Sequence, residues 1–125
     1  MTSPKLSQGN VSLTLGNDTY TLKPTIGAFQ QISGKHGGLA AAMNKIAMLD
    51  LEAIMDCVMA GLGPTYAGPK RRMEFAERVF AEGVSDQTGG IAAACGEYIL
   101  VLMNGGKRVT RNTEDLADGA PDEGN

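Results

Sequence analysis

The chain has 125 residues, the length of one domain, and at this size roughly two-thirds of the unfolded surface can be buried without a metal or a disulfide. Eleven Lys and Arg against 14 Asp and Glu give a net charge of −3, and there is no Trp, with three Tyr and three Phe. This balance disfavours a basic nucleic-acid module and an aromatic platform for single strands. Composition therefore narrows the function classes without choosing one.

Two alternating runs of apolar and polar residues open the patterned part of the chain. The first covers Val11 to Leu15, and the second covers residues 19–23, after the turn-forming Gly16-Asn17-Asp18. Alternation with a period of two residues is typical of a half-buried strand. We expect a β-hairpin of two five-residue strands joined by three turn residues. Its apolar face must pack on the following helices or on a neighbouring subunit, because an isolated hairpin is only marginally stable.

After Pro24 the apolar period changes from 2 to about 3.6 residues, which predicts helices. The sequence therefore predicts a mainly α fold, with the N-terminal hairpin packed on a bundle of four to five short helices. Asp50 is the expected N-cap of the third helix. The apolar faces, in chain order, are Ile26, Phe29 and Ile32; Leu39, Met43 and Ile46; Leu51, Ile54, Met55 and Val58; Met73, Ala76 and Phe80; and Ile91, Cys95, Tyr98, Ile99 and Leu102. The residues predicted for the core are Leu51, Ile54, Met55, Val58, Ile91, Cys95, Ile99 and Leu102.

The two ends of the chain lack apolar periodicity. We expect residues 1–9 and residues 107–125 to be flexible tails around a single domain over residues 10–106. The start has no apolar segment typical of a secretory signal, and the longest apolar run, Tyr98–Met103, is too short to cross a bilayer. We therefore expect a cytoplasmic location, or a place in an assembly made in the cytoplasm, with no membrane partner.

The residues that usually carry catalysis or bind metals are few. Cys57 and Cys95 lie in apolar helical patterns and are expected to be buried free thiols. His36 is the only histidine and lies in a Gly-rich segment, which favours a surface position. Glu52 and Asp56, four residues apart on one helix, read as a solvated acidic edge. We expect no catalytic residues, no cofactor and no metal site.

Five residues are candidates for contact with a protein partner. The chain has seven methionines, and methionine suits both irregular cores and adaptable binding surfaces. Two of them lie off the main apolar faces, and three consecutive basic residues follow at a predicted helix start, where an acidic partner could be steered. The five residues are Met48, Met59, Lys70, Arg71 and Arg72.

The pattern also resembles a small family of tail proteins of phages and gene transfer agents. The resemblance rests on a hairpin followed by Thr25–Ile32 (TIGAFQQI) and on Leu51–Leu62, which ends Met59-Ala60-Gly61-Leu62, and it covers residues 10–106. The family often has an acidic residue where Gln31 stands, so one helix-surface contact of the family does not carry over to this chain. The resemblance implies a role in building a long non-contractile tail.

The family is commonly labelled a tail tube protein, but a tube ring is usually built from β-rich subunits. Two short strands and several helices fit a tail assembly chaperone better, one that covers the helical tape-measure protein and helps tube subunits to assemble. We therefore expect binding to the tape-measure protein, the tube protein or both, through helix-in-groove recognition. A structural tail-tube or head–tail component is the alternative, and a small helical DNA-binding regulator is a third. Self-association into a homo-oligomer is left open.

Overall fold

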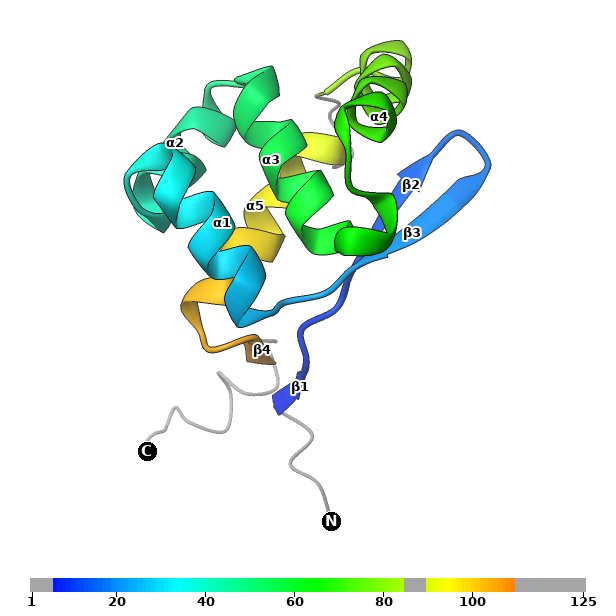
Figure 1. Ribbon diagram of the computed structural model, residues 1–125. Coiled ribbons are helices and arrows are strands. Elements are labelled where there is room, and N and C mark those ends of the chain that lie inside the picture. Colours follow the sequence, from blue (N-terminus) through cyan, green and yellow to red (C-terminus); the bar gives the residue numbers. More distant parts are fainter. Residues whose placement is uncertain (1–5, 85–89, 110–125) are drawn as a thin grey trace, which may run out of the picture.

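An N-terminal β-hairpin packed against five α-helices forms the structure over residues 6–84 and 90–109, the segments that this computed structural model describes (Figure 1). The predicted fold class is thus confirmed. The elements are β1 (Leu6–Gln8), β2 (Val11–Leu15), β3 (Asp18–Leu22), α1 (Ile26–His36), α2 (Leu39–Ala47), α3 (Leu51–Leu62), the 3₁₀ turn η1 (Pro64–Tyr66), α4 (Pro69–Glu82), α5 (Gly90–Met103) and β4 (Lys107–Val109).

The β2–β3 hairpin forms as expected, but its second strand begins and ends one residue earlier than predicted and its turn is shorter. Leu15 pairs with Asp18, so the loop contains two residues, Gly16 and Asn17, instead of three. Gly16 has a φ of 64°, and a glycine with positive φ at the first loop position matches the twist of a tight hairpin. The apolar residues of β2, together with Leu22, are buried as the alternation predicts.

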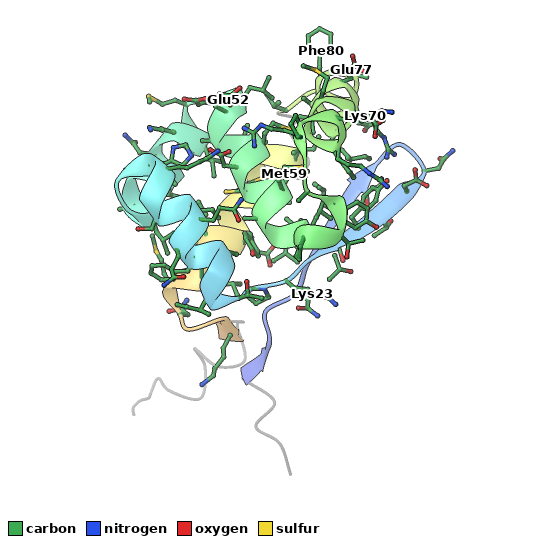
Figure 2. All side chains as sticks on the ribbon, viewed as in Figure 1. Lys23, Glu52, Met59, Lys70, Glu77 and Phe80 are labelled. Carbon is green, nitrogen blue, oxygen red and sulfur yellow. The ribbon has the colours of Figure 1, made fainter. Side chains whose placement is uncertain are left out.

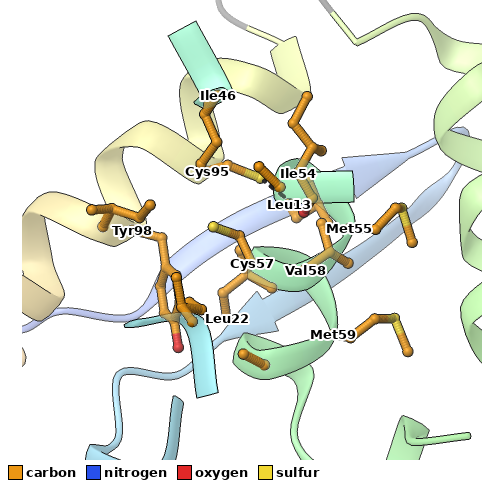
Figure 3. Close-up of a cluster of buried hydrophobic side chains, with 14 of the residues drawn as sticks. Leu13, Leu22, Ile46, Ile54, Met55, Cys57, Val58, Met59, Cys95 and Tyr98 are labelled. Atoms are coloured by element: carbon orange, nitrogen blue, oxygen red, sulfur yellow. Dashed lines mark hydrogen bonds between the residues drawn. The ribbon is translucent and has the colours of Figure 1, made fainter. Parts of the chain in front are cut away.

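Helix α3 is the centre of the fold. Its residues from Ala53 to Gly61 are all buried, and a helix that is covered on every side lies inside the core. Figure 1 shows α1 and α2 on one side of α3, α4 and the hairpin on the other, and α5 crossing behind it. Figure 3 shows Cys57 and Val58 of α3 in the cluster that also contains Tyr98 of α5. The helices and the hairpin therefore share one hydrophobic core.

Seven of the eight residues predicted for the core are buried. The exception is Leu51, which is 39% exposed because it is the first residue of α3. The Asp50 cap is confirmed: its carboxylate accepts hydrogen bonds from the backbone N–H groups of Glu52 and Ala53. Ile26 also departs from the prediction, since it lies exposed at the first position of α1.

The prediction of which face of α4 is buried was wrong. Met73 and Phe80 are 60% and 82% exposed, whereas Phe75 and Val79 are buried. The helix is apolar on two faces, and the rings of Tyr20 and Tyr66 cover the Phe75 face in edge-to-face contacts. Because only one of the two faces can pack on the hairpin, the other is left on the surface.

Two short strands lie in the segments that the sequence assigned to the tails. β1 and β4 pair antiparallel, with Leu6 opposite Val109, and the Gly9 amide donates to the Gly106 carbonyl at 3.2 Å. Backbone pairing of this kind needs no apolar periodicity, which is why the sequence pattern did not indicate it. The rest of both predicted tails, residues 1–5 and 110–125, lies outside the described residues. Within the described residues, no helix is long and apolar enough to cross a membrane.

The contact between α3 and β3 depends on a glycine. A Cβ atom added at Gly61 would lie 2.7 Å from the Cβ of Leu22, closer than packed side chains approach each other. The Gly61 carbonyl also accepts a hydrogen bond from the Lys23 amide at 2.9 Å. The absence of a side chain at position 61 therefore lets the helix touch the hairpin backbone.

We predict that Gly61→Ala lowers the free energy of unfolding by about 1–3 kcal/mol, because the extra methyl group overpacks this contact. Gly34→Ala, inside α1, is the matched control: its added Cβ meets nothing within 4 Å, so it should stabilise the protein by about 0.5–1 kcal/mol through helix propensity. Guanidinium unfolding measures both. Equal stability of Gly61→Ala and the wild type would contradict the close contact.

Candidate partner-binding groove

A groove of about 430 Å³ lies between α1, the end of α3 and the start of α4. We call it the α3–α4 groove. Its lining residues include Gln31, Met59, Pro64, Ala67, Pro69 and Arg72. Two of the five residues predicted for partner contact, Met59 and Arg72, therefore meet in one place.

Proline shapes the wall of this groove. Pro64 opens η1 and Pro69 opens α4, each at a position where a helix leaves the backbone N–H without a partner, so the missing donor costs nothing. The two prolines and Ala67 give the wall a stiff, apolar surface. At the start of α4, Gly68 provides no side-chain cap, so backbone N–H groups of the first turn lack a side-chain acceptor.

Met59 forms part of the buried lining of the groove and is 8% exposed (Figure 2). The expectation that Met59 lies exposed off the apolar face was wrong, because α3 is enclosed on all sides and has no surface face at this turn. A substitution such as Met59→Asp would therefore place a charge in the core.

Met48, at the C-cap of α2, is 67% exposed as expected, and its role in partner contact stays a prediction.

The Arg72 side chain reaches from the groove to a buried carboxylate. One guanidinium nitrogen lies 2.9 Å from Oδ1 of Asp56, and the other lies 2.8 Å from Oε1 of Glu52. Asp56 also accepts hydrogen bonds from Nε2 of His36 at 2.7 Å and from Nζ of Lys35 at 3.3 Å. We call Asp56 and the residues that bind it, Lys35, His36 and Arg72, the Asp56 cluster.

Two sequence expectations fail at this cluster. Asp56 is 3% exposed instead of lying on a solvated edge, and the side chain of His36 is 6% exposed instead of lying on the surface. Nζ of Lys45 lies 3.1 Å from Nδ1 of His36. An ammonium can only donate, so Nδ1 accepts and Nε2 carries the proton given to Asp56. Both ring nitrogens are thereby engaged, and the histidine links α1, α2 and α3.

Opposing effects act on the carboxyl of Asp56. Burial by itself would raise the pKa of Asp56, but the hydrogen bond from His36 and the charges of Arg72 and Lys35 outweigh it, so the pKa lies below its usual 3.8. The carboxylate is therefore ionised at neutral pH. A lone Asp inside the apolar pattern of α3 was the sequence signal for such a cluster, because a buried charge needs partners.

Lys70 and Arg71 lie at the exposed rim where α4 begins. The Arg71 guanidinium lies 5.7 Å from the centre of the Tyr66 ring, a cation–π contact. Lys70 makes no ion pair with any other described residue. The basic triplet is thus divided: Arg72 points to buried Asp56, and the other two residues face solvent beside the groove.

Arg78 is a residue that the sequence reasoning missed. Its guanidinium donates to the Leu15 carbonyl and the Asp18 carboxylate, each at 2.8 Å, and to the Tyr20 hydroxyl. These contacts fasten α4 to the tip of the hairpin. No local pattern indicated them, because about 60 residues of chain separate Arg78 from its partners.

The two cysteines are free and buried, as predicted. The pKa of the Cys57 thiol is raised by a hydrogen bond with Cys95 and by burial, so the thiol stays protonated and unreactive. Within the described residues, His, Cys, Asp and Glu form no group of three that could hold a metal ion.

We predict that Asp56→Ala lowers the free energy of unfolding by about 3–5 kcal/mol, because Arg72 and His36 lose a buried partner. Glu52→Gln is the control: its side chain is 76% exposed, and loss of this surface ion pair should cost at most about 1 kcal/mol. Chemical denaturation compares the two. Similar losses for both variants would show that the Asp56 cluster does not stabilise the fold.

The stability should also depend on pH through Asp56. Because folding lowers the pKa of Asp56, the ionised carboxylate stabilises the protein above 3.8, and this contribution disappears as the pH falls below that value. We expect Asp56→Asn to flatten the acid limb of a stability-against-pH curve, whereas Glu52→Gln keeps it. An unchanged acid limb in Asp56→Asn would assign the acid sensitivity to other carboxyl groups.

Comparison with known proteins identifies no relative of this chain: no family model, no curated protein and no solved structure matches it. The resemblance to phage and gene-transfer-agent tail proteins is therefore neither supported nor contradicted by these searches. What bears on function is the chemistry of the groove and of the surfaces beside it.

Proposed function

We propose that this protein is a tail morphogenesis protein of a phage or gene transfer agent, a tail assembly chaperone that binds a helical segment of the tape-measure or tail tube protein. The observation that carries the proposal is the α3–α4 groove, an apolar depression with a basic rim on a mainly helical domain. The sequence resemblance supplies the biological setting.

The lining of the groove suits one face of an amphipathic helix. Pro64, Ala67 and Pro69 offer apolar contact, and the thioether of Met59 adapts to side chains of different shape. Helices that lie in such grooves insert a few apolar side chains from one face. The tape-measure protein is expected to be long and helical, so it would present such faces repeatedly.

The charges around the groove favour an acidic residue next to the apolar face of that helix. Arg72 is 28% exposed at the groove, and Lys70 and Arg71, which precede it in the chain, lie on the rim. Gln31, across the groove on α1, is neutral. An acidic side chain on the partner would therefore meet positive charge and the uncapped N–H groups at the start of α4.

The size of the groove supports a chaperone over a permanent tail component. A depression of about 430 Å³ receives only a few side chains, whereas permanent assemblies bury far larger surfaces. Modest affinity would allow tube subunits to displace the protein as the tail grows. The described strands form two separate two-stranded sheets, which gives less support to a β-rich ring subunit.

We predict that Ala67→Trp, which fills the groove, abolishes capture of the tape-measure or tube protein. Ala67 is exposed, so the fold should tolerate the change. Ala47→Trp, at an exposed alanine of α2 away from the groove lining, is the matched control and should bind as the wild type does. The measurement is affinity capture with tagged full-length protein from cells that produce tails, with partners identified by mass spectrometry.

Two results would contradict the chaperone proposal. Failure of the wild-type protein to capture either tail protein would remove the proposed partner. Its presence in stoichiometric amounts in purified particles would assign it to the finished tail as a structural component. Equal loss of capture in Ala67→Trp and Ala47→Trp would mean that the groove is not the contact surface.

A further inference from the structure

The outer side of α4 carries an apolar stripe that is largely uncovered in the described structure: Pro69, Met73 and Phe80 are exposed, and Ala76 is partly buried against the core. The stripe consists of Pro69, Met73, Ala76 and Phe80, of which Met73 is 60% and Phe80 82% exposed. Figure 2 shows Phe80 pointing away from the rest of the molecule. At about 100° per residue the four positions fall within an arc of about 60°, so they form one continuous ridge.

The spacing along this ridge is that of a coiled-coil seam. Positions 69, 73, 76 and 80 follow steps of four, three and four residues, the alternation of d and a positions in a heptad. The ridge runs from the first residue of α4 almost to its last. It therefore presents the whole helix, rather than a single side chain, to another helix.

Opposite charges border one side of the ridge. Lys70 and Glu77 occupy the heptad position next to the seam, seven residues apart, and both are exposed (Figure 2). Neither forms an ion pair with another described residue. In coiled coils, residues at this position select the partner and its direction through charge.

We propose that α4 is a homodimerisation helix, which packs antiparallel against α4 of a second copy of this chain about a two-fold axis. In the register that places each a position opposite a d position of the other helix, Met73 packs against Ala76 of the partner subunit. In the same register Phe80 packs against Pro69 of the partner subunit. The same register brings Lys70 next to Glu77 of the partner subunit, twice by symmetry. One helix thus supplies both halves of every contact, as an isologous interface requires.

The charges on α4 favour an antiparallel pair of α4 helices over a parallel pair. In a parallel pair the heptad position of Lys70 and Glu77 would face the opposite flank of the other helix, so these two residues could not meet. Phe75 and Val79 mark the face of α4 that packs on the rest of the domain, and this face lies about 110° around the helix from the ridge.

The expected dimer is weak. A helix of 14 residues is about 21 Å long, and one pair of such helices falls in the size class of transient interfaces. The pairing also affects the α3–α4 groove, because Pro69 belongs both to its wall and to the ridge. Two grooves would be presented by one dimer, which raises the avidity for a partner with repeated binding segments.

Sedimentation equilibrium of the full chain over a range of concentrations tests the proposal. We expect a reversible monomer–dimer equilibrium, and Phe80→Glu should raise its dissociation constant more than about 30-fold, as for loss of an apolar anchor. Met48→Glu is the control, at an apolar residue outside α4 that is 67% exposed, and should leave the constant unchanged. Far-ultraviolet circular dichroism should be the same for both variants, since both side chains are on the surface.

Charge exchange tests the direction of the helices. Lys70→Glu and Glu77→Lys should each weaken the dimer about fivefold to tenfold, and the double variant should restore it, because only the antiparallel register pairs these two positions. A wild type that stays monomeric at millimolar concentration would overturn the proposal. The ridge would then be left as a surface for residues 110–125 or for another protein. A dimer insensitive to Phe80→Glu, or no rescue by the double variant, would also overturn the proposal.

Discussion

The buried carboxylate of Asp56 is the interaction on which the arrangement of the helices depends. It lies in the middle of the central helix, and it is bound by groups from two other helices: His36 and Lys35 at the end of α1 and Arg72 in the first turn of α4. Lys45 of α2 joins the network through His36. Because an unpaired charge in this position would be strongly destabilising, the carboxylate fixes where these helix ends can lie.

The position of α4 follows from this constraint. Arg72 holds the start of the helix to α3, Arg78 holds its second half to the hairpin tip, and Phe75 packs between them against Tyr20. Three different kinds of interaction thus orient the same side of α4 inward. Its other apolar side is left on the surface, where it forms the ridge proposed for dimerisation.

The groove and the ridge are consequences of the same geometry. The chain must turn from the buried end of α3 to the start of α4, and the two prolines of that turn form the wall of the groove, while Pro69 is also the first residue of the ridge. A partner in the groove and a second copy on the ridge would therefore meet at Pro69. Binding of a tail protein and self-association are separate proposals, but the structure places their surfaces side by side.

The sequence by itself determined the elements and most of the core. Period 2 located the hairpin, period 3.6 located the helices, and the carboxylate of Asp50 marked the start of α3, because each of these signals acts within a few residues. It located part of the groove through Arg72, but it could not place Met59, Asp56 and His36 inside the protein. Only the tertiary structure decided which of the two apolar faces of α4 is buried. The periodicity of α4 supports either face, and the choice is made by Tyr20, Asp56 and the hairpin tip, which are distant in sequence and come together only in the folded chain.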